Sequence, residues 1–281
     1  ILKAVQQSEC IYTYEERESI VKYYNKIMNI NRSVEDQKFP TQNIKVHARN
    51  LKIDDIVIGG IVDNEEEKYA ISVKADGERY DLLVKNNSIW LILPDNNVCN
   101  KICNFDNKAL DGFIFDGEEV PIEKRNDKTA KYYYIAFTNL SEGKNLVINK
   151  SLKERLKITN ISVDLMRREI QKNGLKNILN INKMEYFFLN PENIFKEVKK
   201  LKEKKQNYLT DGFMVTPNLT YNPFYVKENG KFLVNEKYKN TKEHILTNIP
   251  DLCKVKPLNE LTIDFKIQYP NLSNNNKTAL L

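Results

Sequence analysis

The chain has 281 residues, of which 41% are hydrophobic and 29% charged, and its formal net charge is +6. This balance excludes wholesale disorder, and no stretch approaches the roughly 18 consecutive apolar residues of a membrane-spanning helix. The positive charge favours a polyanionic partner or a phosphate-rich substrate, although general solubility explains it equally well.

The first residue and the cysteines indicate the context of the chain. Because it begins with Ile1 and has no signal segment, we expect a piece of a longer, cytoplasmic polypeptide. Cys99 and Cys103 form one Cys-x-x-x-Cys pair, and both histidines are remote in sequence, so we expect reduced thiols and no structural zinc site. Abundant Asn, Lys and Ile indicate an AT-rich coding genome.

Hydrophobic periodicity predicts an α+β fold with largely antiparallel sheets. Residues 14–29 have apolar positions at helical spacing, with acids toward the N-terminal end, where the helix dipole favours them. From Tyr69 onward the chain has β character, and Lys85-Asn86-Asn87-Ser88 is typical of a hairpin turn. Two further helices are expected over 151–157 and 191–205. The expected strands cover 69–73, 79–84, 89–93, 112–120, 132–137, 208–216, 252–256 and 261–267.

The segment Lys74-Ala75-Asp76-Gly77-Glu78-Arg79 carries the clearest chemical signal. A lysine at a strand end, crowded by other cations, can lose its proton and act as a nucleophile. Such a lysine can attack the α-phosphorus of a nucleotide and hold the nucleoside monophosphate through a phosphoramide bond. A solvated turn of mixed charge explains this segment equally well, so the interpretation depends on partners elsewhere in the chain.

Three other segments carry acids or lysines that could serve this nucleophile. In Phe115-Asp116-Gly117-Glu118-Glu119, a carboxylate could approach a ribose diol or a metal-bound water, or the acids could be exposed in a turn. In Thr210-Asp211-Gly212-Phe213-Met214-Val215-Thr216-Pro217, the acid stands at a strand entrance, where it could hold Mg²⁺ with phosphate oxygens or be a turn acid. In Leu252-Cys253-Lys254-Val255-Lys256-Pro257, both lysines point to one face of a strand. They could grip phosphates and lower the pKa of a third lysine, or protect an edge strand from aggregation.

Together and in this order, the four segments resemble those of the covalent nucleotidyltransferases, which comprise ATP-dependent polynucleotide ligases and mRNA capping guanylyltransferases. These enzymes share a nucleophile motif Lys-x-Asp-Gly-x-Arg, an acidic motif Asp-Gly-Glu, an aromatic strand, an acid-Gly strand motif and a Lys-x-Lys motif. All of them occur here in the family's order, from Lys74 to Lys256. The acid Asp211, the following Thr216-Pro217 and the later Thr262-Ile263-Asp264-Phe265 resemble the capping branch more than the ligase branch.

The resemblance implies a role for each matching charged residue at the centre of the site. Lys74 would be the nucleophile that becomes guanylylated, and Arg79 would contact the ribose or position the acceptor RNA end. Glu118 would bind ribose hydroxyls or help hold a metal. Asp211 would organise the divalent metal, Mg²⁺ or Mn²⁺.

Further roles concern the base and the phosphates. Phe137 would stack on guanine, with Tyr134 as the other candidate, because the family's usual Phe-Asp reads Phe137-Thr138 here. Lys254 and Lys256 would bind phosphates and neutralise charge as pyrophosphate leaves. Residues 39–42 resemble part of a lid over the guanine.

The resemblance implies an ATP-grasp-like nucleotidyltransferase domain over 39–265, with a helical segment or connector over 1–38 before it. Residues 266–281 are expected to be a tail or the start of a missing OB-fold domain. A closing oligonucleotide-binding (OB) domain, usual after Lys-x-Lys, is expected to be missing or cut. The implied activity is transfer of GMP from GTP to a 5′-diphosphate RNA end, with triphosphatase and methyltransferase parts as partners in a viral or cytoplasmic setting. An ATP-dependent ligase and a catalytically silent nucleotide- or RNA-binding module of a larger complex are the alternatives.

Overall fold

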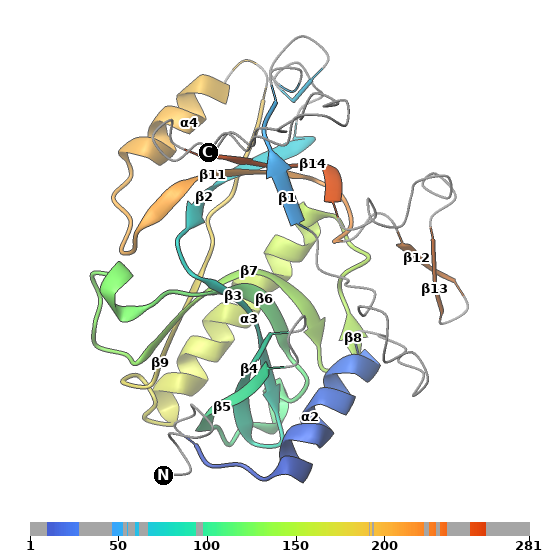
Figure 1. Cartoon of the computed structure of the whole chain (residues 1–281), viewed down its shortest axis with the longest axis vertical. Helices are drawn as coiled ribbons and strands as arrows, with labels where there is room; N and C mark the ends of the chain where they lie inside the picture. The colour runs from blue at the N-terminus through green and yellow to red at the C-terminus, as the bar shows by residue number, and fades with distance from the viewer. Residues whose placement is uncertain are drawn as a thin grey trace, which may run out of the picture.

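In the computed structural model of the chain, two large β-sheets lie one above the other, with helices packed beside them (Figure 1). The structure describes residues 10–27, 47–52, 67–93, 98–190, 194–221, 225–228, 231–234 and 248–256, together with residues 55, 60, 61 and 192. The α+β class with mainly antiparallel sheets, expected from the sequence, is confirmed.

The larger sheet occupies the lower half of the molecule in Figure 1. Its strands are β3 (Glu78–Lys85), β4 (Ser88–Leu93), β5 (Val98–Asn104), β6 (Ile114–Glu119), β7 (Tyr132–Glu142), β8 (Asn145–Leu146) and β9 (Leu179–Lys183). They are ordered β5-β4-β3-β6-β7-β8, with β9 parallel to β7 and all other pairs antiparallel. The predicted hairpin turn between β3 and β4 is confirmed: Asn86 and Asn87 both have φ of 51°, as a tight type I′ turn requires.

The smaller sheet lies above the first one in the same view. Its strands are β1 (His47–Asn50), β2 (Tyr69–Ala75), β10 (Phe187–Phe188), β11 (Thr210–Pro217) and β14 (Asn248–Val255). They are ordered β1-β14-β11-β2-β10, and only β1 with β14 is a parallel pair among them. Because β14 has a neighbour on each side, the edge-strand explanation of its lysines is wrong. A separate hairpin joins β12 (Tyr225–Glu228) and β13 (Lys231–Val234).

The helices are α2 (Tyr14–Ile27), α3 (Leu152–Lys172) and α4 (Ile194–Glu203). The predicted end of the middle helix at Lys157 is wrong. It begins at a capping box formed by Ser151 and Glu154, and it continues because Val163, Met166 and Ile170 extend its apolar stripe into the core. α3 thereby covers one face of the larger sheet, along β7 and β9.

The sequence reading missed or shortened several strands. β5, β9 and the short β1 and β10 were not expected, and β7 runs well beyond the predicted end at Phe137. The strand expected over 261–267, the residues 262–265, the lid segment 39–42 and the domain boundaries at 38 and 265 lie outside the described residues. In the described part of the chain, no helix combines the length and the apolar character needed to cross a membrane.

Candidate active site

A cavity of about 350 Å³ lies between the two sheets, within the size range of small-molecule sites. The side chains that line it come from both sheets, from the N-terminal turn of α3 and from two loops: Ser72, Lys74, Met214, Thr216, Leu252, Lys254, Arg79, Asp116, Glu118, Phe137, Thr138, Leu152, Arg155, Met184, Tyr186 and Tyr221 among others. Of the residues predicted for the site, Lys74, Arg79, Glu118, Phe137 and Lys254 are therefore brought together at one cavity.

Lys74 lies near the end of β2 and points into the cavity. It shares a strand face with Ser72, while Ile71 and Val73 pack into the hydrophobic core, as the alternation of a strand requires. Its Nζ donates to both carboxylate oxygens of Asp211, at 2.7 and 2.9 Å. The nucleophile and the acid predicted for the site are thus in direct contact, although they are 137 residues apart in sequence.

The predicted cluster of lysines surrounds this contact. Lys254 lines the cavity from β14, and the Nζ of Lys256, just beyond that strand, lies 3.6 Å from Asp211. Asp211 therefore stands between two cations, at 17% side-chain exposure. The arrangement gives the site several positive groups for a polyphosphate and one carboxylate that neutralises part of their charge.

Gly212 explains why Asp211 can reach Lys74. Its φ of +118° is unfavourable for residues with a side chain, and a Cβ there would lie 1.9 Å from the carbonyl oxygen of Val255. The register of β11 against β2 shifts between Thr210 and Phe213 at the same point. The acid-glycine pair is thus a local irregularity that lets β14 approach closely and aims the carboxylate toward β2.

Glu118 is partly buried and lies close enough to Lys74 for the two charges to interact. Burial raises the pKa of its carboxyl to about 7, while the charges of Lys74 and Arg79 oppose that rise. Its Oε2 has no hydrogen-bond partner among the described residues. A buried carboxylate oxygen without a partner is available to a ligand.

The same carboxylates bear on the predicted metal. No group of three His, Cys, Asp or Glu side chains in the described part of the chain could hold a metal ion. Glu118 and Asp211 do influence each other electrostatically, and both lie near Lys74. Because Mg²⁺ is commonly held by one or two carboxylates together with substrate phosphates, these residues fit a metal that binds with the nucleotide.

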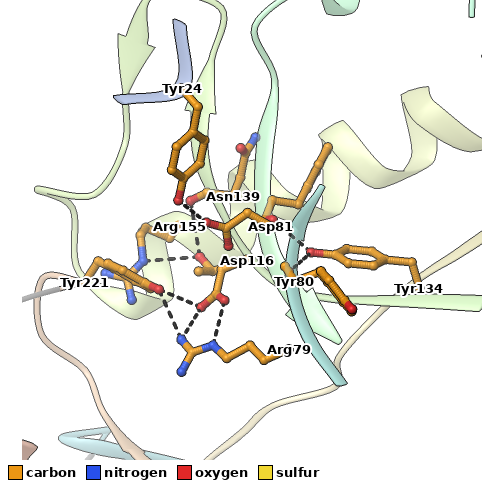
Figure 2. A network of polar contacts seen from close by, with 11 residues as sticks. Tyr24, Arg79, Tyr80, Asp81, Asp116, Tyr134, Asn139, Arg155 and Tyr221 are labelled. Carbon is orange, nitrogen blue, oxygen red and sulfur yellow. Dashed lines mark hydrogen bonds and ion pairs between the residues drawn. The ribbon is translucent and has the colours of Figure 1, made fainter. Parts of the chain in front are cut away.

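Arg79, on the opposite wall, belongs to a buried polar network (Figure 2). Its Nε and Nη2 donate to the two oxygens of Asp116, at 3.0 and 2.8 Å. Tyr221 donates to Asp116 at 2.7 Å and accepts from Arg79 at 3.2 Å. Asp116 is 2% exposed and lies within strand β6, so the explanation of Asp-Gly-Glu as an exposed turn is wrong.

The network continues toward the N-terminal helix. Asp81 faces Asp116 across the β3–β6 pair, and both are buried. The hydroxyl of Tyr24, from α2, donates to Asp81, and Ile20 on the same helix packs beside Trp90 in the core. Figure 2 shows Tyr24 and Tyr221 converging on the two acids from different elements. This arrangement links α2 to the wall that carries Arg79.

The aromatic strand β7 contributes Phe137 and Thr138, both on the cavity. The register against β6 shifts here, since Asp116 pairs with Thr138 but Gly117 with Ala136. Phe137 is thus the extra residue of a β-bulge, which allows two consecutive side chains to face the cavity. Tyr134, the other stacking candidate, is instead fully buried in the core, where its single hydroxyl proton is shared between the carbonyl oxygens of Tyr80 and Phe115, both at 2.8 Å.

Sequence reasoning missed several residues that shape the cavity. Asp116 stood inside a quoted motif but received no role, while Tyr24, Tyr221 and Arg155 belong to no motif. The spacing of the motifs gave no sign of these three, because their contacts join segments far apart in the chain. Only their burial and their hydrogen bonds to groups far away in the sequence reveal them.

Comparison with known proteins gives an independent account of the chain. Residues 61–239 match the family described as "mRNA capping enzyme, catalytic domain". That range covers more than half of the chain and includes Lys74, Glu118, Phe137 and Asp211. Comparison with curated protein sequences finds no match.

Comparison with solved structures finds distant similarities. The ligase domain of LigD from M. tuberculosis is 10% identical with a TM-score of 0.36, over 67% of this chain and 53% of that one. The Chlorella virus DNA ligase-adenylate is 14% identical with a TM-score of 0.38, over 63% of this chain and 62% of that one. A protein named Pmar-Lig_Pre is 12% identical with a TM-score of 0.43, over 76% of this chain and 46% of that one. The chain thus spans between 46% and 62% of the length of these three proteins.

Proposed function

Because the chain belongs to the family of mRNA capping enzyme catalytic domains, we propose that it is an RNA guanylyltransferase with Lys74 as its nucleophile. The observation that supports this most is the contact of Lys74 with Asp211 at a cavity lined by further cations. A surface turn of mixed charge would have neither the cavity nor a carboxylate from a distant strand.

In the first half-reaction, the Nζ lone pair of Lys74 attacks the α-phosphorus of GTP. A nitrogen–phosphorus bond forms, the bond from the α-phosphorus to the bridging oxygen breaks, and pyrophosphate leaves with that electron pair. The attacking amine must lose a proton, and Asp211 is the acceptor already in contact with it.

The surrounding cations act on the phosphates. Lys254 and Lys256 lie where they can bind the β- and γ-phosphates and stabilise the charge that grows on the leaving group. A bound Mg²⁺ or Mn²⁺, held by Asp211 and Glu118 with phosphate oxygens, would add Lewis-acid stabilisation of the same charge. Phe137 offers a flat face for the base, and the unpartnered Glu118 oxygen suits a ribose hydroxyl.

In the second half-reaction, a terminal oxygen of a 5′-diphosphate RNA end attacks the phosphorus of the lysine adduct. The nitrogen–phosphorus bond breaks, GMP passes to the RNA, and Lys74 regains a proton. Arg79, fixed by Asp116 and Tyr221, lies on the wall opposite Lys74, where it can orient the incoming end. The diphosphate end itself requires a triphosphatase, and later methylation requires a methyltransferase, from other domains or subunits.

The experiment that tests this function compares nucleotides and acceptors with the full chain. We expect α-labelled GTP with Mg²⁺ to label the protein covalently, and the label to move to 5′-diphosphate RNA. Equal or preferential labelling by ATP, with sealing of nicked strands, would replace the proposal by a ligase. Tight nucleotide binding without any covalent label, even with a supplied OB-type domain, would identify a catalytically silent module.

A further inference from the structure

Arg155 is a buried cation on the cavity that the reaction described above does not use. It lies in the first turns of α3, is 3% exposed and lines the cavity. Its Nε donates to the Thr138 hydroxyl at 3.2 Å, and its Nη1 donates to the carbonyl oxygens of Lys150 and Leu219 at 2.6 and 2.9 Å. These bonds fix the plane and position of the guanidinium.

The hydrogen-bond partners of Arg155 carry no charge. They are a hydroxyl and two carbonyls, and burial lowers the pKa of its guanidinium to about 10. Nη2 has no hydrogen-bond partner among the residues that the structure describes. By contrast, Arg79 on the same cavity has a carboxylate on two of its nitrogens. Arg155 therefore offers N–H donors on a rigid, desolvated cation, a group suited to acceptors on a ligand.

The location of Arg155 identifies the part of the nucleotide that it meets. Its partner Thr138 follows Phe137 in the bulge of β7, and its guanidinium lies 5.6 Å from the centre of the Tyr221 ring. Figure 2 shows Arg155 beside Tyr221, on the side of the network away from Tyr134. The phosphate end has its own cations at Lys74 and Lys254. A base stacked on Phe137 would have its edge next to Arg155.

We propose that Arg155 selects guanine over adenine by donating from Nη2 to O6 and N7 of the base. Guanine presents two acceptors at this edge, whereas adenine presents N7 and an amino donor at the place of O6. An adenine amino group would face a cationic donor, and both would be left unpaired in a buried site. This inference rests on the proposed function, because it assumes that the base stacks on Phe137.

The test uses α,β-methylene analogues of GTP, ITP and ATP, which bind but cannot transfer their nucleotide to the enzyme. ITP keeps O6 and N7 and lacks only the 2-amino group. We expect the unmodified chain to bind the GTP and ITP analogues alike and more tightly than the ATP analogue. In Arg155→Met, the GTP and ITP analogues should weaken together by about 10- to 100-fold, with the ATP analogue changed less than about twofold.

Several outcomes would overturn the inference. Equal weakening of all three analogues would make Arg155 a phosphate-binding or structural residue. Weakening of the GTP analogue alone would mean that Arg155 acts on recognition of the 2-amino group and not on O6 and N7. If Arg155→Met does not fold, Arg155→Lys carries the test, because lysine keeps the charge but cannot bind Thr138 and the base together. Its preference for the GTP over the ATP analogue must then fall at least about fivefold. An unmodified chain that prefers the ATP analogue would refute the guanylyltransferase proposal itself.

Discussion

Two cations of one short segment, Lys74 and Arg79, make different ion pairs on opposite walls of the cavity. Lys74 belongs to the smaller sheet, and its side chain and that of its partner Asp211 are 23% and 17% exposed. Arg79 belongs to the larger sheet, and the side chain of its partner Asp116 is 3% exposed and also accepts a hydrogen bond from Tyr221. The first pair joins cations at the cavity to one carboxylate that a ligand can replace, whereas the second pair is held by a network of hydrogen bonds.

The difference indicates that the two cations of this segment have different roles. The turn at Asp76 and Gly77 connects β2 of one sheet to β3 of the other, so a few residues supply both walls. A nucleophile must change partners during the reaction, whereas a group that orients a substrate should not move. We therefore expect substitutions at the Lys74 pair to affect labelling, and substitutions at the Arg79 pair to affect folding as well.

The largest effect is expected at the exchangeable pair. In Asp211→Asn, the proton acceptor for Lys74 is lost, so the rate of covalent labelling by GTP should fall at least about 100-fold. The free energy of unfolding, measured by urea denaturation, should change by less than about 1 kcal/mol because the pair is partly exposed. A variant that labels at the normal rate would remove Asp211 from the chemistry.

The fixed pair should respond in the opposite way. Asp116→Asn leaves Arg79 without its carboxylate in a mostly buried network, and we expect a loss of about 3 kcal/mol in the free energy of unfolding. The matched control is Asp76→Asn, which removes the more exposed pair of Asp76 with Lys124 and should change the free energy of unfolding far less. Equal losses of unfolding free energy in the two variants would contradict the distinction between the buried Arg79–Asp116 pair and the more exposed Asp76–Lys124 pair.

The next prediction concerns the pH dependence of stability and of GTP affinity, and it distinguishes Glu118 from its neighbour Glu119. The folded protein holds the Glu118 proton more tightly than the unfolded chain, because burial raises its pKa from 4.5 to about 7. Stability contributed by this group is therefore greatest at low pH, falls as the pH rises from about 4.5 to about 7, and is constant above that range. If the carboxylate form binds the nucleotide, GTP affinity should rise about tenfold between pH 6 and pH 8.

Glu119 supplies the control for this prediction. Burial raises its pKa to about 7 as well, but it is not among the described residues that line the cavity. Glu118→Gln and Glu119→Gln should each flatten the dependence of unfolding free energy on pH. Only Glu118→Gln should abolish the pH dependence of GTP affinity, measured by titration calorimetry. The same loss in Glu119→Gln would show that the effect does not arise in the cavity.

The smallest effect is expected at the aromatic strand. Phe137→Leu removes a stacking face, so GTP affinity should fall about fivefold. Tyr134→Phe should leave GTP affinity unchanged but lower the free energy of unfolding by about 1 kcal/mol, because its hydroxyl bonds two buried carbonyls. The reverse pattern would make Tyr134 the stacking residue and contradict the observed bulge.

The sequence was informative where local rules decide the structure. Asn86 and Asn87 predict a tight hairpin because few residues tolerate positive φ, and the strand alternation places Lys254 and Lys256 on one face. The length of α3 was misjudged, although its apolar spacing continues through Met166 and Ile170. β-branched residues in its middle weaken helix propensity, and burial against β7 and β9 outweighs that preference.

In the candidate site, only the residues that belong to recognisable sequence motifs could be predicted. The resemblance named Lys74 and Asp211, and the structure shows them in contact. It could not name Tyr221 or Arg155, because their roles in the site depend on burial and on hydrogen-bond partners that lie far away in the sequence. The sequence predicted that other cations surround Lys74. It did not show that Lys74 also forms a salt bridge with the carboxylate of Asp211.

The central claim is that Lys74 itself carries the nucleotide, and peptide mapping tests it most directly. After incubation of the full chain with GTP and Mg²⁺, mass spectrometry should find one GMP on the peptide that contains Lys74, and Lys74→Met should take up none. A GMP adduct on another residue, or undiminished labelling of Lys74→Met, would contradict the account.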